Sequence, residues 1–496
     1  MRRVTYSAVI ACLLFVALTT PAAARSPADV AAPAARSPTQ YRDQLRSELD
    51  SLLRVGVNRP YGLAWSDAPE PTLRNAPRNS PAPIVSYESS HTPAAGLLLH
   101  LASRLLDTTP DFAPDAQRFS EAALAVARGM QSSVDSNGRL PGSATFTPSG
   151  VSNREPYGSF PRRNPTTAAL GFLLILDRDL DGKDIRVAST TVRMSNWLLK
   201  QQLSPGVFPV SIEFPGEKYP RRVVRLDLPD TRDGVLTLLL IQLSAKDRDT
   251  SLPSTPARFA AERAVQQLIR LRISELGKSS RHLWPSVFDM NSTVITVLPD
   301  LPPAGNLLAS RYALQTLLAY HLHTGDIEIF DIAKLSAEAL SERKTPANTF
   351  PLIDDPKNKY PPPTPKPATE LEAFTNPPGP PIWPQRDYGI SDTLRTTADL
   401  RVLGHPTFSR LTARTIPPDL ALAYILTGVL DQLPTADLPL SAAQIPPFQF
   451  AYPEFFAPLE GPEPVNLTPR IKRLAALYLL ASWEQRFSTP TSPPSP

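Results

Sequence analysis

One stretch of the chain concentrates arginines and aspartates in a pattern that suits recognition of an anionic substrate. Residues 213–233 hold Arg221, Arg222, Arg225, Asp227, Asp230, Arg232 and Asp233. A guanidinium pairs bidentately with a carboxylate, and carboxylates hold cations or transfer protons. We therefore interpret Arg225, Arg232 and Asp230 as candidate catalytic residues, and Asp230 and Asp233 as candidate ligands of a metal. The alternative is a salt-bridged loop capping a helix that starts at Asp233, with Asp230 as its N-cap.

Further candidates for substrate binding lie in this segment and in other parts of the chain. They are Arg162, Arg163, Arg221, Arg222, Trp284 and Arg311. The arginines would pair with sugar carboxylates, and the indole would stack on a sugar ring. Each has a structural alternative: a solvated pair for Arg162 and Arg163, an ion pair at the edge of the core for Arg311, and a packing anchor for Trp284.

A repeated unit must position these side chains. The segment Thr191 to Pro209 reads TVRMSNWLLKQQLSPGVFP, and related amphipathic segments end at Pro141, Pro285 and Pro351. Each is preceded by a helix that is apolar nearly all round, as expected of a helix buried among others. These four helices are predicted at Pro93–Leu106, Thr166–Leu176, Asp233–Leu243 and Ala309–His321.

The pattern predicts an all-α fold, an (α/α) toroid of repeated helical hairpins with the long loops on one face. Turns from inner to outer helices are mostly short, whereas the connections from outer to inner helices are long. Since the helices of a hairpin run antiparallel, all the long loops emerge on the same face as the N-termini of the inner helices, which favour anions. An open solenoid is the alternative, but solenoid repeats are normally shorter.

The predicted organisation has six parts. They are a signal peptide at 1–24, a disordered leader at 25–40, the main part of the toroid at 41–351, a Pro-rich insertion at 352–390, C-terminal helices at 391–487 that complete the toroid or pack on it, and a disordered tail at 488–496. We expect export to the periplasm or the exterior, and no transmembrane segment. The Pro-rich insertion could recruit a protein partner.

Composition narrows the class of partner. The formal net charge is +4, which falls to +2 once Arg2 and Arg3 are removed with the signal peptide, so we expect no nucleic acid partner. The single cysteine, Cys12, lies inside the predicted signal peptide. The mature chain would therefore contain neither a cysteine nucleophile nor a disulfide. The 58 prolines against 21 glycines indicate stiff connections.

The segment WLLKQQLSPGVFP at Trp197–Pro209 resembles the hairpin signature of the pectic acid lyases, polysaccharide lyase family ten. It is also similar to the wider toroid superfamily that includes the squalene cyclases. The likeness extends from Asp184 to roughly Asp326. It implies Ca²⁺-assisted β-elimination on an acidic polysaccharide, with an arginine as the base. The sequence departs from the family pattern at two places. Val207 stands where the signature has glycine. The stretch at 297–303 matches the segment that follows the family's catalytic arginine, but no arginine precedes it here.

Two functions remain open from sequence. The first is an exported carbohydrate-active protein that binds or cleaves an acidic polysaccharide. The second is a non-catalytic toroid that serves as an envelope scaffold or binds a protein partner. The degenerate motif leaves the choice between enzyme and binding protein undecided.

Overall fold

The structure is a computed structural model that describes most of the predicted toroid. The described ranges are 40–66, 82–89, 91–153, 164–203, 206–212, 221–246, 248–273, 281–289, 305–345 and 466–488, with scattered residues between 291 and 293, between 347 and 354, between 385 and 397, and at 464. The predicted signal peptide, nearly all of the leader and of the Pro-rich insertion, residues 398–463 of the predicted C-terminal helices and the tail after Ser488 lie outside these residues.

The described helices form two rows. The outer row comprises α2 (Gln40–Val55), α4 (Ala113–Ser133), α6 (Ile185–Gln201), α8 (Ser254–Leu271) and α10 (Ile327–Ser341). The inner row comprises α17 (Leu467–Ser488), α3 (Thr92–Asp107), α5 (Asn164–Asp179), α7 (Asp230–Ala245) and α9 (Leu307–Thr324). A short 3₁₀ turn, η2 (Pro110–Phe112), leads into α4. The predicted helices are therefore confirmed within these residues.

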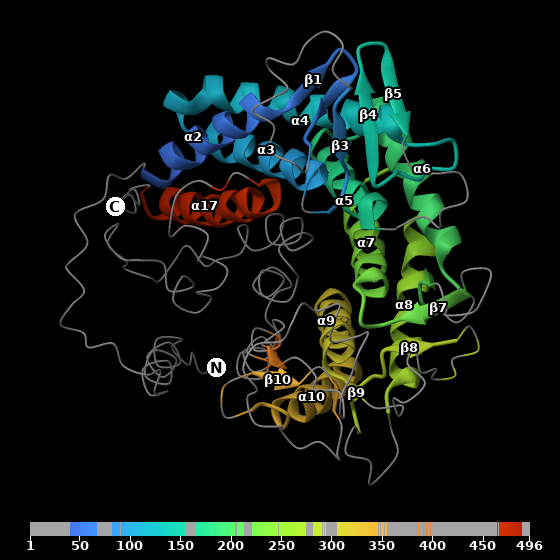
Figure 1. Cartoon of the computed structure of the whole chain (residues 1–496). Helices are drawn as coiled ribbons and strands as arrows, with labels where there is room; N and C mark the ends of the chain where they lie inside the picture. The colour runs from blue at the N-terminus through green and yellow to red at the C-terminus, as the bar shows by residue number, and fades with distance from the viewer. Residues whose placement is uncertain are drawn as a thin grey trace, which may run out of the picture.

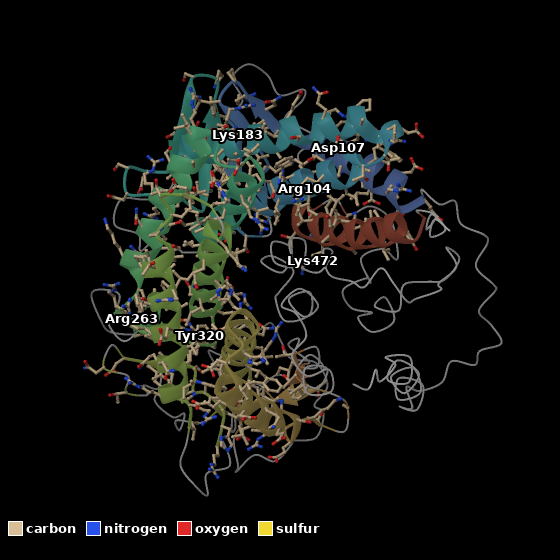
Figure 2. The ribbon with its side chains drawn as sticks, turned by 180° about the vertical axis from the view of Figure 1, so that it is seen from behind. Arg104, Asp107, Lys183, Arg263, Tyr320 and Lys472 are labelled. Carbon is tan, nitrogen blue, oxygen red and sulfur yellow. The ribbon has the colours of Figure 1, made fainter. Side chains whose placement is uncertain are left out.

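These helices pack as successive hairpins around an arc (Figure 1). Helix α3 packs on α4, α5 on α6, α7 on α8 and α9 on α10, and each inner helix also packs on the next one, from α3 to α9. Figure 2 shows both rows from behind, with Arg263 labelled on outer helix α8 and Lys472 on inner helix α17. The described residues thus form an arc of an (α/α) toroid, as predicted.

The first and the last described helices of the chain form one hairpin. The C-terminal α17, red in Figure 1, packs on the N-terminal α2 and on α3. Arg473 of α17 donates to both carboxylate oxygens of Glu48 in α2 at 3.0 Å, and both side chains are buried. Helix α17 is therefore an inner helix whose outer partner lies more than 400 residues earlier in the chain.

Burial follows the sequence pattern of each row. In α3 almost every residue is buried, including Leu97, Leu98 and Leu99, whereas α8 buries only one face. Removal of this apolar surface from water is the main stabilising term of the arc.

The same turn ends several outer helices. After α6, the Leu203 N–H donates to the Val207 carbonyl and the Gly206 N–H donates to the Leu203 carbonyl. The same two bonds join Asp135 to Arg139 and Gly138 after α4. After α8 the corresponding bonds join Ile273 to Leu283 and His282, across a longer connection in which residues 274–280 lie outside the described ones. Gly138, Gly206 and His282 each have a positive φ. Each lies two positions before the residue called here the closing residue of its turn, which is Leu140, Phe208 or Trp284.

A hydroxyl then fixes each turn to the next inner helix. The backbone N–H of the closing residue donates to a Ser or Thr in the first turn of that helix. The pairs are Trp65 with Thr92 (3.1 Å), Leu140 with Thr166 (3.0 Å), Phe208 with Thr231 (3.4 Å) and Trp284 with Ser310 (2.9 Å). The repeat thus begins one hairpin earlier than the sequence pattern indicated.

The long loops contain short antiparallel strands, which the sequence analysis did not predict. They are β1 (Val57–Arg59), β2 (Gly62–Ala64), β3 (Ile84–Ser86), β4 (Ser143–Thr147), β5 (Gly150–Asn153), β6 (Val210–Ile212), β7 (Arg221–Arg225), β8 (Val287–Phe288), β9 (Gly305–Asn306), β10 (Phe350–Pro351), β11 (Ile353–Asp354) and β12 (Gln385–Arg386). Strands of successive loops pair, as β3 with β4, β7 with β8 and β9 with β11. The long loops therefore share one face, called here the long-loop face.

Candidate functional site

Helix α7 starts on the long-loop face and carries three of the predicted site residues in its first turn. Its N-cap is Pro229, which makes no side-chain capping bond, and Asp230 is the first helical residue. The predicted start at Asp233 and the N-cap role of Asp230 are therefore wrong. Asp230 is partly buried, whereas Arg232 and Asp233 are almost fully buried.

Arg232 is held between two inner helices. Its Nε and Nη2 lie 2.7 and 2.6 Å from Oδ1 of Asp233, and its Nη1 donates to Oε1 of Gln315 on α9 at 3.2 Å. Only 5% of Arg232 is exposed. A buried guanidinium is tolerated when a carboxylate and further acceptors meet its N–H groups.

An aromatic ring joins a second arginine to this group. The Arg232 Cζ lies 4.5 Å from the ring centroid of Tyr312, and the Arg311 Cζ lies 5.4 Å from the same centroid. Tyr312 and Arg311 are both partly buried in the first turns of α9. We call Arg232, Asp233, Arg311, Tyr312 and Gln315 the Arg232 cluster.

The hydrogen-bond chain continues beyond α9. Gln315 Nε2 donates to Oγ1 of Thr393 at 3.2 Å, and Thr393 is helical and buried. The polar chain from Asp233 through Arg232 and Gln315 to Thr393 therefore connects three successive segments near the long-loop face. Desolvating such a chain costs stability, so its presence inside an apolar arc is a reason to look for function there.

Arg225 has a different environment from Arg232. Its Nε and Nη2 bind the two carboxylate oxygens of Asp227 at 2.9 and 2.5 Å. The hydrogen bond with Asp227 raises the pKa of Arg225, burial opposes this, and the charges of Asp227 and Asp230 raise it further. A general base needs a lowered pKa, so these contacts do not favour Arg225, a predicted catalytic residue, as the arginine base that the family resemblance implies.

The remaining predicted arginines are Arg221 and Arg222 on β7, and Arg162 and Arg163. Arg222 is exposed on β7, where the neighbouring Val223 and Val224 are buried. Arg221 begins the same strand. Arg162 and Arg163 lie outside the described residues. Of the predicted site residues, the structure brings together Arg232, Asp233 and Arg311.

The predicted stacking role of Trp284 is wrong. The residue is 0% exposed, and its Nε1 donates to the Leu268 carbonyl of α8 at 2.7 Å. Trp65 makes the equivalent bond to the Leu52 carbonyl of α2 at 2.9 Å. Both indoles lock a turn to the preceding outer helix, so neither offers a ring face to a sugar.

Sequence reasoning missed Tyr312 and Gln315. Gln315 lies four residues after Arg311 on a helix that is otherwise strongly apolar, so the two share a helix face. The signal available in the sequence was therefore a glutamine four residues after an arginine within an apolar helix. Its partner on α7 could not be identified before the two helices were placed side by side.

The described residues contain no group of three or more His, Cys, Asp or Glu side chains arranged to hold a metal ion. One oxygen of Asp233 is already bound by Arg232. A Ca²⁺ site at Asp230 and Asp233 thus remains a prediction. Within the described part of the chain, no helix combines the length and apolarity needed to span a bilayer.

Comparison with known proteins adds little beyond architecture. No protein-family model and no curated protein matches this chain. Similar solved structures include an unsaturated glucuronyl hydrolase specific for heparin (10% identity, 91% of this chain and 96% of that chain, TM-score 0.42). Others are a GH76 α-mannanase of Bacteroides thetaiotaomicron (8%, 91% and 97%, 0.45) and a cold-adapted family 8 xylanase (10%, 91% and 94%, 0.39). At these identities and TM-scores no substrate or residue role is transferred, and the pectic acid lyase resemblance stays a prediction.

Proposed function

We propose that this protein is an exported carbohydrate-active protein that binds an acidic polysaccharide at the Arg232 cluster. The observation that carries the proposal is the fixed, buried Arg232 at the start of α7, bound by Asp233 and Gln315 and stacked on Tyr312 beside Arg311. A pre-organised guanidinium at the N-terminal ends of two inner helices favours a carboxylate ligand.

Each member of the cluster has a separate role in this proposal. Arg232 supplies a fixed positive charge and holds Asp233. Arg311, which is partly buried, pairs with a uronate carboxylate, and Tyr312 offers its ring to the sugar. Asp230, partly buried in the first turn of α7, is the candidate proton-transfer group. If Ca²⁺ takes part, Asp230 and Asp233 would contribute hard oxygen ligands and the ion would neutralise the uronate.

Binding and cleavage are tested together on polygalacturonate and alginate, with Ca²⁺ or with a chelator. Absorbance of an unsaturated uronate reports β-elimination, new reducing ends without that absorbance report hydrolysis, and calorimetry reports binding. We expect Arg311→Gln to weaken binding about tenfold, because it removes a charge-assisted pair. The control is Arg270→Gln, which changes an exposed arginine on α8. Equal binding by the two variants, or no binding of any uronate polymer by the wild type, would exclude the proposal.

A non-catalytic role is the second candidate. It is favoured by the ion pairs that occupy both predicted catalytic arginines, Arg225 with Asp227 and Arg232 with Asp233. In that case the Pro-rich insertion, predicted from sequence, recruits a protein partner. Pull-down with the full chain and with a chain lacking residues 352–384 tests this role, and an identical set of partners from both would count against it.

A further inference from the structure

The turn after α8 differs from its counterparts after α4 and α6. At the position with positive φ, the other two turns have Gly138 and Gly206, and here the residue is His282 with φ +70°. A Cβ at Gly138 or Gly206 would lie 2.4–2.5 Å from backbone atoms of the next outer helix. His282 thus places an imidazole where the equivalent turns admit no side chain at all.

Backbone pairing gathers two arginines around this imidazole. The Ile273 N–H donates to the Leu283 carbonyl at 2.9 Å, and the His282 N–H donates to the Ile273 carbonyl at 2.8 Å. These bonds place Arg272, just before Ile273, beside Arg281 and His282. Trp284, two residues after His282, is anchored to α8 through the Leu268 carbonyl and to α9 through Ser310. We call Arg272, Arg281 and His282 the Arg272 cluster.

Four side-chain nitrogens of this cluster lack a hydrogen-bond partner within the described structure. Within the described structure, four buried nitrogens accept or donate no hydrogen bond: Nε and Nη1 of Arg272, Nε of Arg281 and Nδ1 of His282. The three residues as a whole are only partly buried, so other atoms of the same residues reach the surface, where a solute can contact them. Buried polar atoms in proteins are nearly always hydrogen-bonded, and several unmet nitrogens around one turn indicate a missing acceptor.

We propose that the Arg272 cluster is a binding site for an oxyanion of the sulfate or phosphate type, either free or carried as an ester on a polymer. Like charges held together without an acid bonded to them are stabilised by an anion, and an oxyanion presents several acceptor oxygens to such a group. The site is distinct from the Arg232 cluster, because it lies on the turn that follows an outer helix. It stands whether or not the uronate site does.

Protonation of His282 should strengthen binding. Burial lowers the pKa of His282, and the charges of Arg272 and Arg281 lower it further, whereas Glu338 and Glu342 of α10 raise it. A bound oxyanion would offset the two arginines and favour the imidazolium. Affinity for sulfate, whose own charge is constant across this range, is therefore expected to rise as the pH falls through the imidazole titration.

Calorimetry of the full chain with sodium sulfate, at ionic strength held constant with sodium chloride, tests the site. We expect Arg272→Gln and Arg281→Gln each to weaken binding about tenfold, because each removes a charge-assisted bond. His282→Asn should bind sulfate with little dependence on pH. The matched control is Arg270→Gln in the last turn of α8, exposed and outside the cluster, which should bind as the wild type does.

The source of the oxyanion is identified by competition between inorganic sulfate, a sulfated oligosaccharide and its desulfated counterpart. Tighter binding of the sulfated oligosaccharide supports a polymer-borne ester, and binding of inorganic sulfate at least as tight supports a free ion. Loss of sulfate binding in Arg270→Gln as large as in Arg272→Gln would show diffuse attraction and overturn the proposal. So would a wild type that does not distinguish sulfate from chloride. Neither result bears on the uronate assays.

Discussion

The two basic clusters of this protein differ in how their charges are satisfied. In the Arg232 cluster the guanidinium has a carboxylate, an amide and an aromatic ring as neighbours, and it is almost fully buried. In the Arg272 cluster two arginines and a histidine lie at one turn with four nitrogens unbonded. Arg232 has its partners within the arc, between α7 and α9, so the ligand proposed for the first cluster would meet Arg311 and Tyr312. The second cluster instead has nitrogens without a partner of their own.

The density of arginines in the sequence therefore does not by itself locate a binding site. The segment 213–233 has the denser sequence pattern, yet its described arginine side chains separate into a buried pair, a partly buried bidentate pair and an exposed side chain. None of Arg272, Arg281 and His282 was predicted as a site residue. Partners, which only the tertiary structure supplies, decide which cation is available to a ligand.

The largest expected effect concerns Asp233. Asp233→Asn leaves the buried Arg232 without its counter-charge, and we expect a loss of about 3–5 kcal/mol in the free energy of unfolding. The control Asp227→Asn breaks the more exposed pair with Arg225 and should cost less than about 1 kcal/mol. Replacing both members, as Arg232→Leu with Asp233→Leu, should cost less than Asp233→Asn alone. Urea unfolding measures all three, and equal losses for the two single variants would contradict the comparison.

The turns provide the next largest effect. Gly206 has φ +107°, and a Cβ there would lie 2.5 Å from the Arg263 backbone, so Gly206→Ala should destabilise the protein by about 1–3 kcal/mol. Gly325→Ala distinguishes the steric clash of a Cβ from the strain of a positive φ. Gly325 has φ +77°, but nothing lies within 4 Å of a Cβ built there.

We therefore expect a smaller loss for Gly325→Ala. His282→Gly should change stability by less than about 1 kcal/mol, because glycine accepts this φ but gains entropy in the unfolded chain. Thermal and urea unfolding test this order, and a Gly206→Ala variant no less stable than Gly325→Ala would refute the close approach.

A smaller effect is expected for Arg272. Arg272→Met removes a cation that has no hydrogen-bond partner at two of its nitrogens, so the free energy of unfolding without added oxyanion should change by less than about 1 kcal/mol. Arg232→Met should cost several-fold more, because it strands Asp233. A large loss for Arg272→Met in chloride buffer would indicate that Arg272 is structural, and the contrast between the clusters would disappear.

The smallest effect is a change in pH dependence at the opposite ends of the inner helices. Burial raises the pKa of Asp179, but bonds and charges from His100 and Arg104 outweigh it, so the pKa lies below its usual value. That contribution to stability is present above the unfolded pKa and is lost as the pH falls. Burial raises the pKa of Asp177 above its usual value, and Arg248 opposes this only in part. That contribution is present at low pH and is lost as the pH rises through the raised pKa.

Two asparagine variants should therefore change the slope of stability against pH in opposite directions. Below about pH 4, Asp179→Asn should flatten the rise in stability with pH, and above about pH 4, Asp177→Asn should steepen the change of stability with pH. Urea unfolding at several pH values measures both slopes. Slopes that change in the same direction would show that the two carboxylates do not differ as the structure indicates.

Much of the fold was predictable because burial leaves a periodic trace in the sequence. Helices α3, α5, α7 and α9 are apolar nearly all round, and their amphipathic partners end in recurring Pro motifs, so the hairpin and the face of the long loops followed from periodicity. The first hairpin position was missed, because Trp65 is not followed by proline as Leu140, Phe208 and Trp284 are. The loop strands were missed because strands of two to five residues leave no clear period.

What the sequence determined by itself was the alternation of inner and outer helices, since each residue's hydrophobicity reports its own burial. What the tertiary structure decided was every pairing between distant segments: α17 with α2, Arg232 with Gln315, and Trp284 with Leu268. Hydrogen bonds and ion pairs depend on which groups come within about 3 Å of each other. Separations of 83 residues between Arg232 and Gln315, or 425 between Glu48 and Arg473, leave no local pattern from which that proximity could be read.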